Sequence, residues 1–197
     1  QTGTFSTQEL DTLAMRKVLG WLTLLVLGVL LLPAPVFAHP GHPGESFGHG
    51  LLHPFSGADH MLAMVAVGLL AARCTGAGRW ALPASFVVAM LAGGLVGLTG
   101  FGPEVASMEW VIAASVLVLG LMVSALPSVP VVTSTLIVAA FAVFHGYAHV
   151  AEMGDAMPAG FLGGMTLGTA VLHAIGLVGG LALVRRGEAR YVRLAGA

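Results

Sequence analysis

Apolar runs close to twenty residues long recur through most of this chain, and they constrain its fold more than any other feature. About twenty apolar residues is the length that an α-helix needs to cross the hydrocarbon core of a bilayer. Of the 197 residues, 57% are hydrophobic and only 9% are charged, whereas a soluble domain carries roughly a quarter charged residues. The chain is therefore predicted to be all-α, a polytopic transmembrane helix bundle.

Five of these runs lie beyond residue 53 and are predicted to span the membrane. Their bounds are 55–72, 80–100, 110–126, 130–149 and 159–184, and the connections between them are rich in turn residues. Glycine is clustered in AGGLVG (92–97), GFLGGMTLG (160–168) and GLVGG (176–180). Small residues at four-residue spacing let helix backbones approach closely, so these clusters predict tight helix packing.

The segment MRKVLGWLTLLVLGVLLLPAPVFA, residues 15–38, has the basic, apolar and small-residue parts of a secretory signal peptide. We expect cleavage after Ala38, which leaves five spans; a retained leader would add a sixth. Residues 1–14 are interpreted as an N-terminal extension that is non-native or precedes the true start. An extracytoplasmic His-rich segment (39–52), the transmembrane bundle (53–184) and a cytoplasmic basic tail (185–197) follow.

The few charges between the runs predict the orientation of the chain. If the mature N-terminus is outside, Arg73, Arg79 and the arginines of residues 185–197 fall inside, as the positive-inside rule requires. We expect a multi-pass protein of the bacterial inner membrane with a cytoplasmic C-terminus. The single Cys74 excludes an intrachain disulfide. Nothing in the charge pattern indicates nucleic acid as a partner, and no nucleotide-binding loop or ATPase partner is evident.

A first group of polar residues stands at the outer end of the first predicted span, in HPFSGADH (53–60). Ionisable side chains at membrane depth are costly and usually serve a function, which makes His53, Asp59 and His60 candidates. Ser56 and Asp59 also have the spacing of a helix capping box. The alternative is therefore that Asp59 only caps the helix while the histidines anchor it at the interface.

A second group lies at the outer end of the fourth span, in FHGYAHVAEM (144–153). His145 and His149 are four residues apart and Glu152 is three further, so all three project from one helical face. Two imidazoles and a carboxylate on one stripe suit a divalent transition metal; the alternative is a pair of hydrogen-bonded core histidines. His173 lies near the middle of the fifth span. It is either a packed, hydrogen-bonded core residue or a metal ligand.

Outside the bundle, His39, His42, Glu45 and His49 form a flexible stretch suited either to loose metal capture or to a solvated linker. If the first and fourth spans are neighbours, the two polar groups converge at the outer mouth of the bundle. The predicted metal ligands are His39, His42, His53, Asp59, His60, His145, His149, Glu152 and His173. We expect no prosthetic group and no enzymatic activity; the expected partners are a divalent metal ion and the lipid bilayer, and a homo-oligomer is left open.

The stretch HPFSGADHMLAMVAVGL resembles the signature of the HupE/UreJ family of small nickel/cobalt permeases, and FHGYAHVAEM and LHAIGL resemble that family's later histidine motifs. The resemblance extends from His39 to about Val184. It implies secondary uptake of Ni²⁺, or of Co²⁺, for hydrogenase or urease maturation, and it carries function onto the seven predicted ligands from His53 to His173. His39 and His42 are predicted from composition alone. Two other functions stay open: an intramembrane zinc hydrolase, for which the chain offers no HExxH motif, and a bis-histidine haem protein.

Overall fold

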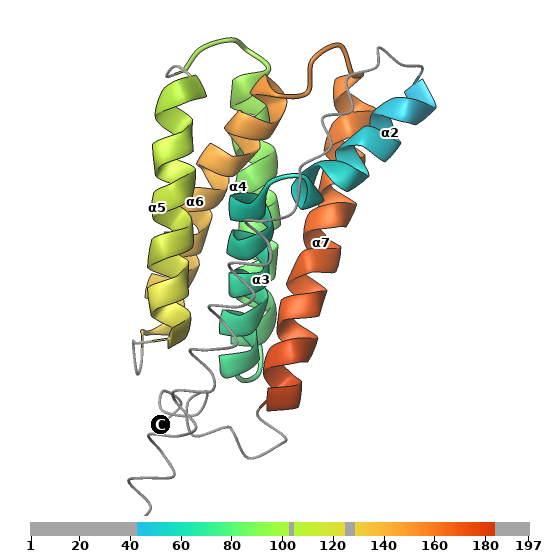
Figure 1. The fold of residues 1–197 in the computed structure, drawn as a ribbon. Helices are drawn as coiled ribbons and strands as arrows, with labels where there is room; N and C mark the ends of the chain where they lie inside the picture. Colours follow the sequence, from blue (N-terminus) through green and yellow to red (C-terminus); the bar gives the residue numbers. More distant parts are fainter. Residues whose placement is uncertain (1–42, 103–104, 125–128, 184–197) are drawn as a thin grey trace, which may run out of the picture. The chain divides into compact units, whose positions relative to one another are not determined.

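The fold is described here from a computed structural model, for residues 43–102, 105–124 and 129–183. These residues form helices and loops with no strand among them, so the all-α prediction is confirmed for this part of the chain (Figure 1). The helices are α2 (Pro43–Leu52), the 3-10 helix η1 (His53–Phe55), α3 (Ala58–Arg73), α4 (Gly78–Gly97), α5 (Val105–Ser124), α6 (Val131–Ala151) and α7 (Pro158–Leu183). The predicted signal peptide and extension, His39, His42 and the basic tail lie outside the described residues.

Each predicted span corresponds to one of the helices α3 to α7, and the largest difference is the start of α5, at residue 105 rather than 110. By length and composition, α4, α6 and α7 are each able to cross a membrane. A fourth candidate is a broken span, in which the segments Ser46–Phe55 and Ala58–Arg73 are bent by 77°. The apolar stretch Met108–Ser124 of α5 is shorter. The described residues therefore contain three to four candidate spans, as in a membrane protein.

The break before α3 has a local cause in the sequence. Pro54 lies in the first turn of η1, and Gly57, the residue before α3, has an extended backbone with φ −108° and ψ 127°. The hydroxyl of Ser56 donates to the carbonyl oxygen of His53 (2.6 Å), and no side chain caps α3. The capping box, which was the alternative role for Asp59, therefore does not form. Asp59 Oδ1 instead accepts the backbone N–H of the next residue, His60, at 2.8 Å.

Helix α2 occupies part of the stretch that we expected to be flexible. It packs against the first half of α7, because glycines on both helices let the backbones touch: a Cβ on Gly50 would overlap the carbonyl oxygen of Phe161, and one on Gly164 would overlap that of Phe47. The buried hydroxyl of Ser46 also accepts the backbone N–H of Met157 (2.9 Å). The contact with α7 orders this segment, whose own composition does not predict a helix.

The other close helix pairs also depend on glycine, as predicted. Gly68 of α3 and Gly176 of α7 face each other, and a Cβ on either would collide with the backbone of the opposite helix. Gly93 of α4 and Gly146 of α6 allow the same close approach between α4 and α6, because a Cβ on either would collide with the backbone of the other helix. Since backbones this close leave no room for a side chain, these contacts fix how α6 and α7 lie against α4 and α3.

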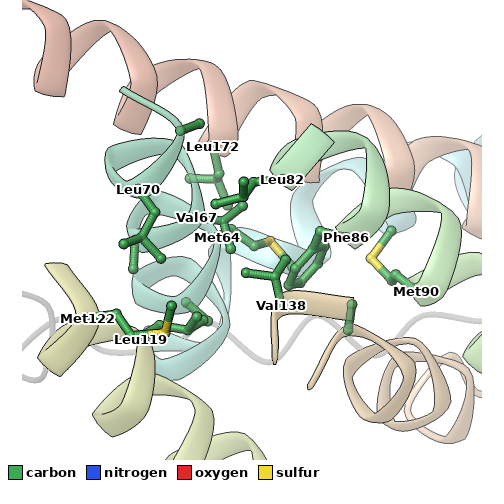
Figure 2. Packing of buried hydrophobic residues seen from close by; sticks show 14 of the residues in the cluster. Met64, Val67, Leu70, Leu82, Phe86, Met90, Leu119, Met122, Val138 and Leu172 are labelled. Carbon is green, nitrogen blue, oxygen red and sulfur yellow. The ribbon is translucent and has the colours of Figure 1, made fainter. Parts of the chain in front are cut away.

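Buried apolar side chains from α3 to α7 form the main core, which includes Met64, Phe86, Leu119, Val138 and Leu172 (Figure 2). Large apolar side chains are also exposed, on α4, α5 and α6 among others: Trp80, Val88, Trp110, Leu117, Val132 and Leu136. A bundle that is apolar both inside and on its outer surface is typical of helices solvated by lipid. Met64 and Met165 are fully buried in this core.

Candidate metal site

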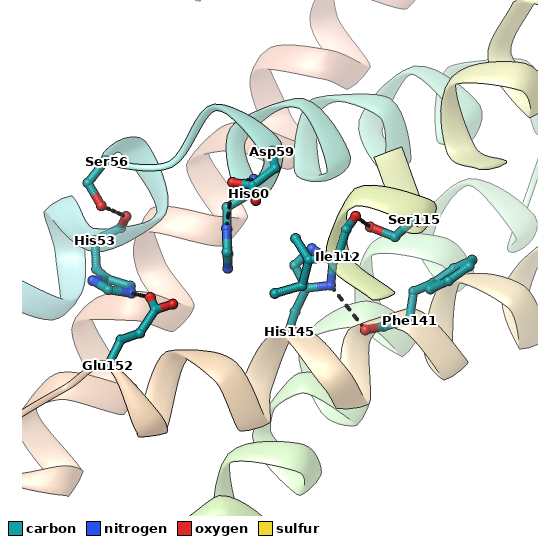
Figure 3. Close-up of polar contacts among 9 residues, drawn as sticks. All are labelled: His53, Ser56, Asp59, His60, Ile112, Ser115, Phe141, His145 and Glu152. Atoms are coloured by element: carbon teal, nitrogen blue, oxygen red, sulfur yellow. Dashed lines mark hydrogen bonds and ion pairs between the residues drawn. The ribbon is translucent and has the colours of Figure 1, made fainter. Parts of the chain in front are cut away.

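The two polar motifs meet, as the sequence predicted they would if their spans were neighbours. His53 Nε2 lies 3.1 Å from Glu152 Oε2, which joins η1 to the residue after α6 across 99 positions of the chain (Figure 3). The His53 side chain is 11% exposed and that of Glu152 is 44% exposed. The hydrogen bond from His53 lowers the pKa of Glu152 below its ordinary value, so this carboxylate is ionised at neutral pH.

Deeper in the bundle, His60 approaches from α3 and meets both histidines of α6. Its ring centroid lies 4.4 Å from that of His149 and 5.1 Å from that of His145. His145 and His149 are completely buried, and His60 is 7% exposed. The spacing prediction for α6 is therefore confirmed in its geometry: the two imidazoles face the same neighbour, with centroids 6.5 Å apart.

Hydrogen bonds decide which nitrogen of His60 and of His145 is free. His145 Nδ1 lies 3.0 Å from the carbonyl oxygen of Phe141, which only accepts, so Nδ1 carries the proton. His60 Nδ1 lies 2.9 Å from Asp59 Oδ1, and an ionised carboxylate likewise only accepts. As neutral imidazoles, both rings therefore present an unprotonated Nε2. Both Nε2 atoms are buried without a hydrogen-bond partner among the described residues. A metal-binding histidine is typically oriented in this way, through its other nitrogen.

His149 lies between the His53–Glu152 pair and the ring of His60. Its ring centroid is 4.9 Å from that of His53 on one side and 4.4 Å from that of His60 on the other. Both of its nitrogens are buried, and neither has a partner in the described part of the chain. We call His53, His149 and Glu152 the exposed group, and His60, His145 and His149 the buried group. His149 belongs to both.

The exposed group has the dimensions of a metal site. One ligand atom from each of His53, His149 and Glu152 lies within 4.8 Å of the other two. Two ligands that each bind one ion at about 2.1 Å are at most about 4.2 Å apart, so a small approach of the side chains is enough to close the site. Together with Asp59, the two groups contain four imidazoles and two carboxylates. The two carboxylates carry two negative charges when ionised, which a divalent cation balances.

His173 lies apart from both groups. It is 3% exposed, and neither ring nitrogen has a partner among the described residues. Its ring centroid is 5.0 Å from that of Phe86, whose ring lies 5.6 Å from His145. The sequence left His173 open between packing and ligation, and its role as a ligand stays a prediction.

One residue of the site was placed only in the flexible stretch and not among the predicted ligands. His49, in the last turn of α2, has its ring centroid 5.8 Å from that of His53 and 5.3 Å from that of Phe161, and it is exposed. Its spacing of four residues before His53 was the available signal, but its meaning depends on α2 being helical. We call His49 together with the exposed and buried groups and Asp59 the histidine cluster.

Comparison with known proteins covers the whole cluster. The family model described as "HupE / UreJ protein" matches residues 26–197. A curated relative, "Protein HupE" from Rhizobium leguminosarum bv. viciae, is 39% identical over 173 residues, which cover 86% of this chain and 88% of the relative. No solved structure matches.

Proposed function

This chain belongs to the HupE/UreJ family, and we propose that it is a permease that imports a divalent transition-metal cation through the histidine cluster. Ni²⁺ is the proposed cargo, with Co²⁺ as the second. The family is one of transporters rather than enzymes, and the proposed use of the metal is the maturation of a hydrogenase or a urease. In this proposal the exposed group faces the outside of the inner membrane and residues 185–197 face the cytoplasm.

The observation that carries the proposal is the pair of Nε2 atoms on His60 and His145, which are buried beside His149 and have no hydrogen-bond partner in the described part of the chain. Buried polar atoms are nearly always paired, so three imidazoles turned toward one another are arranged for a ligand that accepts their lone pairs. Nitrogen donors with carboxylates suit Ni²⁺, Co²⁺, Zn²⁺ or Cu²⁺, whereas Mg²⁺ prefers oxygen ligands. The donor set therefore fits a transition-metal ion.

The position of His149 suggests how an ion would move. A cation held by the exposed group already touches His149, so it can exchange His53 and Glu152 for His60 and His145 while His149 remains its neighbour. At no point does the ion lose all of its protein ligands. Inward movement of a divalent ion gains about 4.6 kcal/mol per 100 mV, twice the value for a single charge, so the membrane potential is sufficient as the driving force.

Uptake by the purified, reconstituted chain tests this function. We expect proteoliposomes to accumulate Ni²⁺, and expect His60→Ala to abolish uptake and His149→Ala to reduce it strongly. Thr135→Ala is the matched control on α6, because its hydroxyl donates to the carbonyl oxygen of Val131 in the same helix and no other partner is found for it among the described residues. Normal uptake by both histidine variants, at matched protein amounts, would contradict the proposed path.

A metal panel separates the remaining alternatives. Ni²⁺, Co²⁺, Zn²⁺, Cu²⁺ and Mn²⁺ supplied one at a time to cells without other importers would establish the order of preference. Stoichiometric bound zinc with no ion flux would favour the hydrolase instead, and visible absorbance of the purified protein would favour the haem protein.

A further inference from the structure

His49 and His53 come four residues apart where α2 runs into η1, and their imidazole rings are in contact. The two ring centroids are 5.8 Å apart at an interplanar angle of 85°, compared with 4.9 Å between the centroids of His53 and His149. His53 also lies against Glu152, as Figure 3 shows. The His49 ring therefore adjoins the exposed group, although it is not a member of it.

Phe161 of α7 contacts both of these imidazoles. Its ring is fully buried, and its centroid lies 5.3 Å from that of His49 and 5.2 Å from that of His53. The interplanar angles are 67° and 65°, so the two imidazoles meet the same ring in the same edge-to-face arrangement. Aromatic rings attract one another at these separations and angles. The buried ring therefore keeps His49 and His53 next to each other.

The backbone of α2 next to His49 is fixed on α7. A Cβ on Gly50 would overlap the carbonyl oxygen of Phe161, so the two backbones touch there. One turn earlier, the buried hydroxyl of Ser46 accepts the backbone N–H of Met157. Ser46 and Gly50 thus form the packed face of the helix, which leaves His49 on another face, where its side chain is exposed. An exposed imidazole on a fixed backbone is available to a ligand in a defined position.

We propose that His49 and His53 form an entry site, in which two imidazoles bind the transition-metal ion before it reaches His149 and Glu152. This proposal rests on the proposed function. Two histidines four residues apart on one helical face are a spacing that binds a divalent transition metal, with one neutral nitrogen from each ring. Because His53 belongs both to this pair and to the exposed group, the ion can exchange His49 for His149 and Glu152 while it stays bound to His53.

The exposure of the imidazoles decreases in the order in which the ion would meet them. His49 is exposed, the His53 side chain is 11% exposed, and His149 is completely buried. An ion bound by His49 and His53 therefore exchanges its water for protein ligands in steps, rather than losing all of it on entering the buried group. Since His49 serves only capture, it should determine how well uptake works at low Ni²⁺ concentration and not the rate of passage at saturation.

The concentration dependence of Ni²⁺ uptake into proteoliposomes tests the entry site in the full chain. We expect His49→Ala to raise the Ni²⁺ concentration for half-maximal uptake several-fold and to leave the maximal rate close to that of the wild type. The matched variant combines Gly48→His with His49→Gly, which keeps the composition but turns the imidazole by about 100° around α2. A Cβ on Gly48 meets nothing within 4 Å, so this position accepts a side chain. The double variant should behave like His49→Ala.

Three results would overturn the entry site. The first is an unchanged concentration dependence for His49→Ala. The second is a lower maximal rate for His49→Ala with no change in the half-maximal concentration. The third is wild-type uptake by the double variant, because an imidazole anywhere on this stretch would then be sufficient and the contact with His53 would have no role.

A second measurement is independent of metal transport. The purified, untagged chain is treated with diethylpyrocarbonate, which modifies accessible imidazoles, and the modification of His49 is followed by mass spectrometry. We expect Ni²⁺ to slow this modification several-fold, Mg²⁺ at the same concentration to have no effect because it prefers oxygen ligands, and His53→Ala to remove the protection. Modification at the same rate with and without Ni²⁺, or full protection after His53→Ala, would refute the entry site. Absence of Ni²⁺ uptake by the wild-type chain would instead refute the proposed function, and the protection of His49 would still decide whether the pair binds the ion.

Discussion

Gly146 lies between the two histidines of α6, and its replacement by alanine should disable the histidine cluster without removing a ligand. A Cβ at this position would overlap the carbonyl oxygen of Met90 and would lie 2.6 Å from its carbonyl carbon and 2.9 Å from the nitrogen of Gly94. Ordinary contacts between carbon atoms are about 3.5–4.0 Å. Helices α4 and α6 would therefore have to separate by about 1 Å at this level.

The consequence for stability is smaller than the consequence for transport. Overpacking of this kind costs about 1–3 kcal/mol, and replacing a glycine inside a helix with alanine offsets about 1 kcal/mol of that cost. A displacement of about 1 Å moves His145 and His149 relative to His60, and misplacement on this scale at a functional site lowers a rate about 100-fold. We expect Gly146→Ala to lose about 100-fold in Ni²⁺ uptake and at most about 2 kcal/mol in the free energy of unfolding.

The assay combines Ni²⁺ uptake into proteoliposomes with thermal unfolding of the same preparations. Gly120→Ala is the matched control, because a Cβ on this helical glycine of α5 meets nothing within 4 Å. The control should keep wild-type uptake and should be as stable as the wild type or slightly more stable. If Gly146→Ala takes up Ni²⁺ as fast as Gly120→Ala, the inferred dependence of the cluster on the α4–α6 contact is refuted.

Three further predictions follow from the same contacts. Gly176→Ala should lower the melting temperature relative to Gly179→Ala, because a Cβ at 176 collides with the backbone of α3 whereas one at 179 meets nothing within 4 Å; equal melting temperatures would count against the α3–α7 contact. Asp59→Asn should weaken Ni²⁺ binding by about 10–100-fold, the usual effect of losing a carboxylate behind a metal-binding histidine, and titration calorimetry that shows unchanged affinity would contradict this role. Since the hydrogen bond from His53 lowers the pKa of Glu152, the stability it adds is present above the ordinary carboxyl pKa and is lost as the pH falls through the lowered value. His53→Ala should raise that pKa, measurable by carbon NMR titration, and an unshifted titration would show that the bond does not form.

Much of the helix pattern could be predicted from the sequence because it depends on local properties. An apolar run in a nearly uncharged chain has to be helical when no water is present to pair its backbone, and α3 to α7 agree with the predicted runs to within a few residues. The shared face of His145 and His149 likewise follows from helix periodicity alone. These predictions needed no knowledge of what lies opposite each helix.

The features that the sequence did not predict depend on contacts between distant segments. Helix α2 is ordered by glycines of α7, more than a hundred residues away, so its own composition gave no sign of it. A helix cap was the alternative role for Asp59, but its carboxylate pairs with the ring of His60, a partner that sequence spacing does not distinguish.

The most direct test of the central claim, that imidazoles of the cluster bind the transported ion, is X-ray absorption at the nickel edge of the purified chain loaded with one equivalent of Ni²⁺. The wild type is expected to show at least two imidazole ligands together with oxygen donors, and His149→Ala is expected to lose imidazole scattering because His149 belongs to both the exposed and the buried group. A nickel shell made only of oxygen, or one that His149→Ala leaves unchanged, would contradict the account.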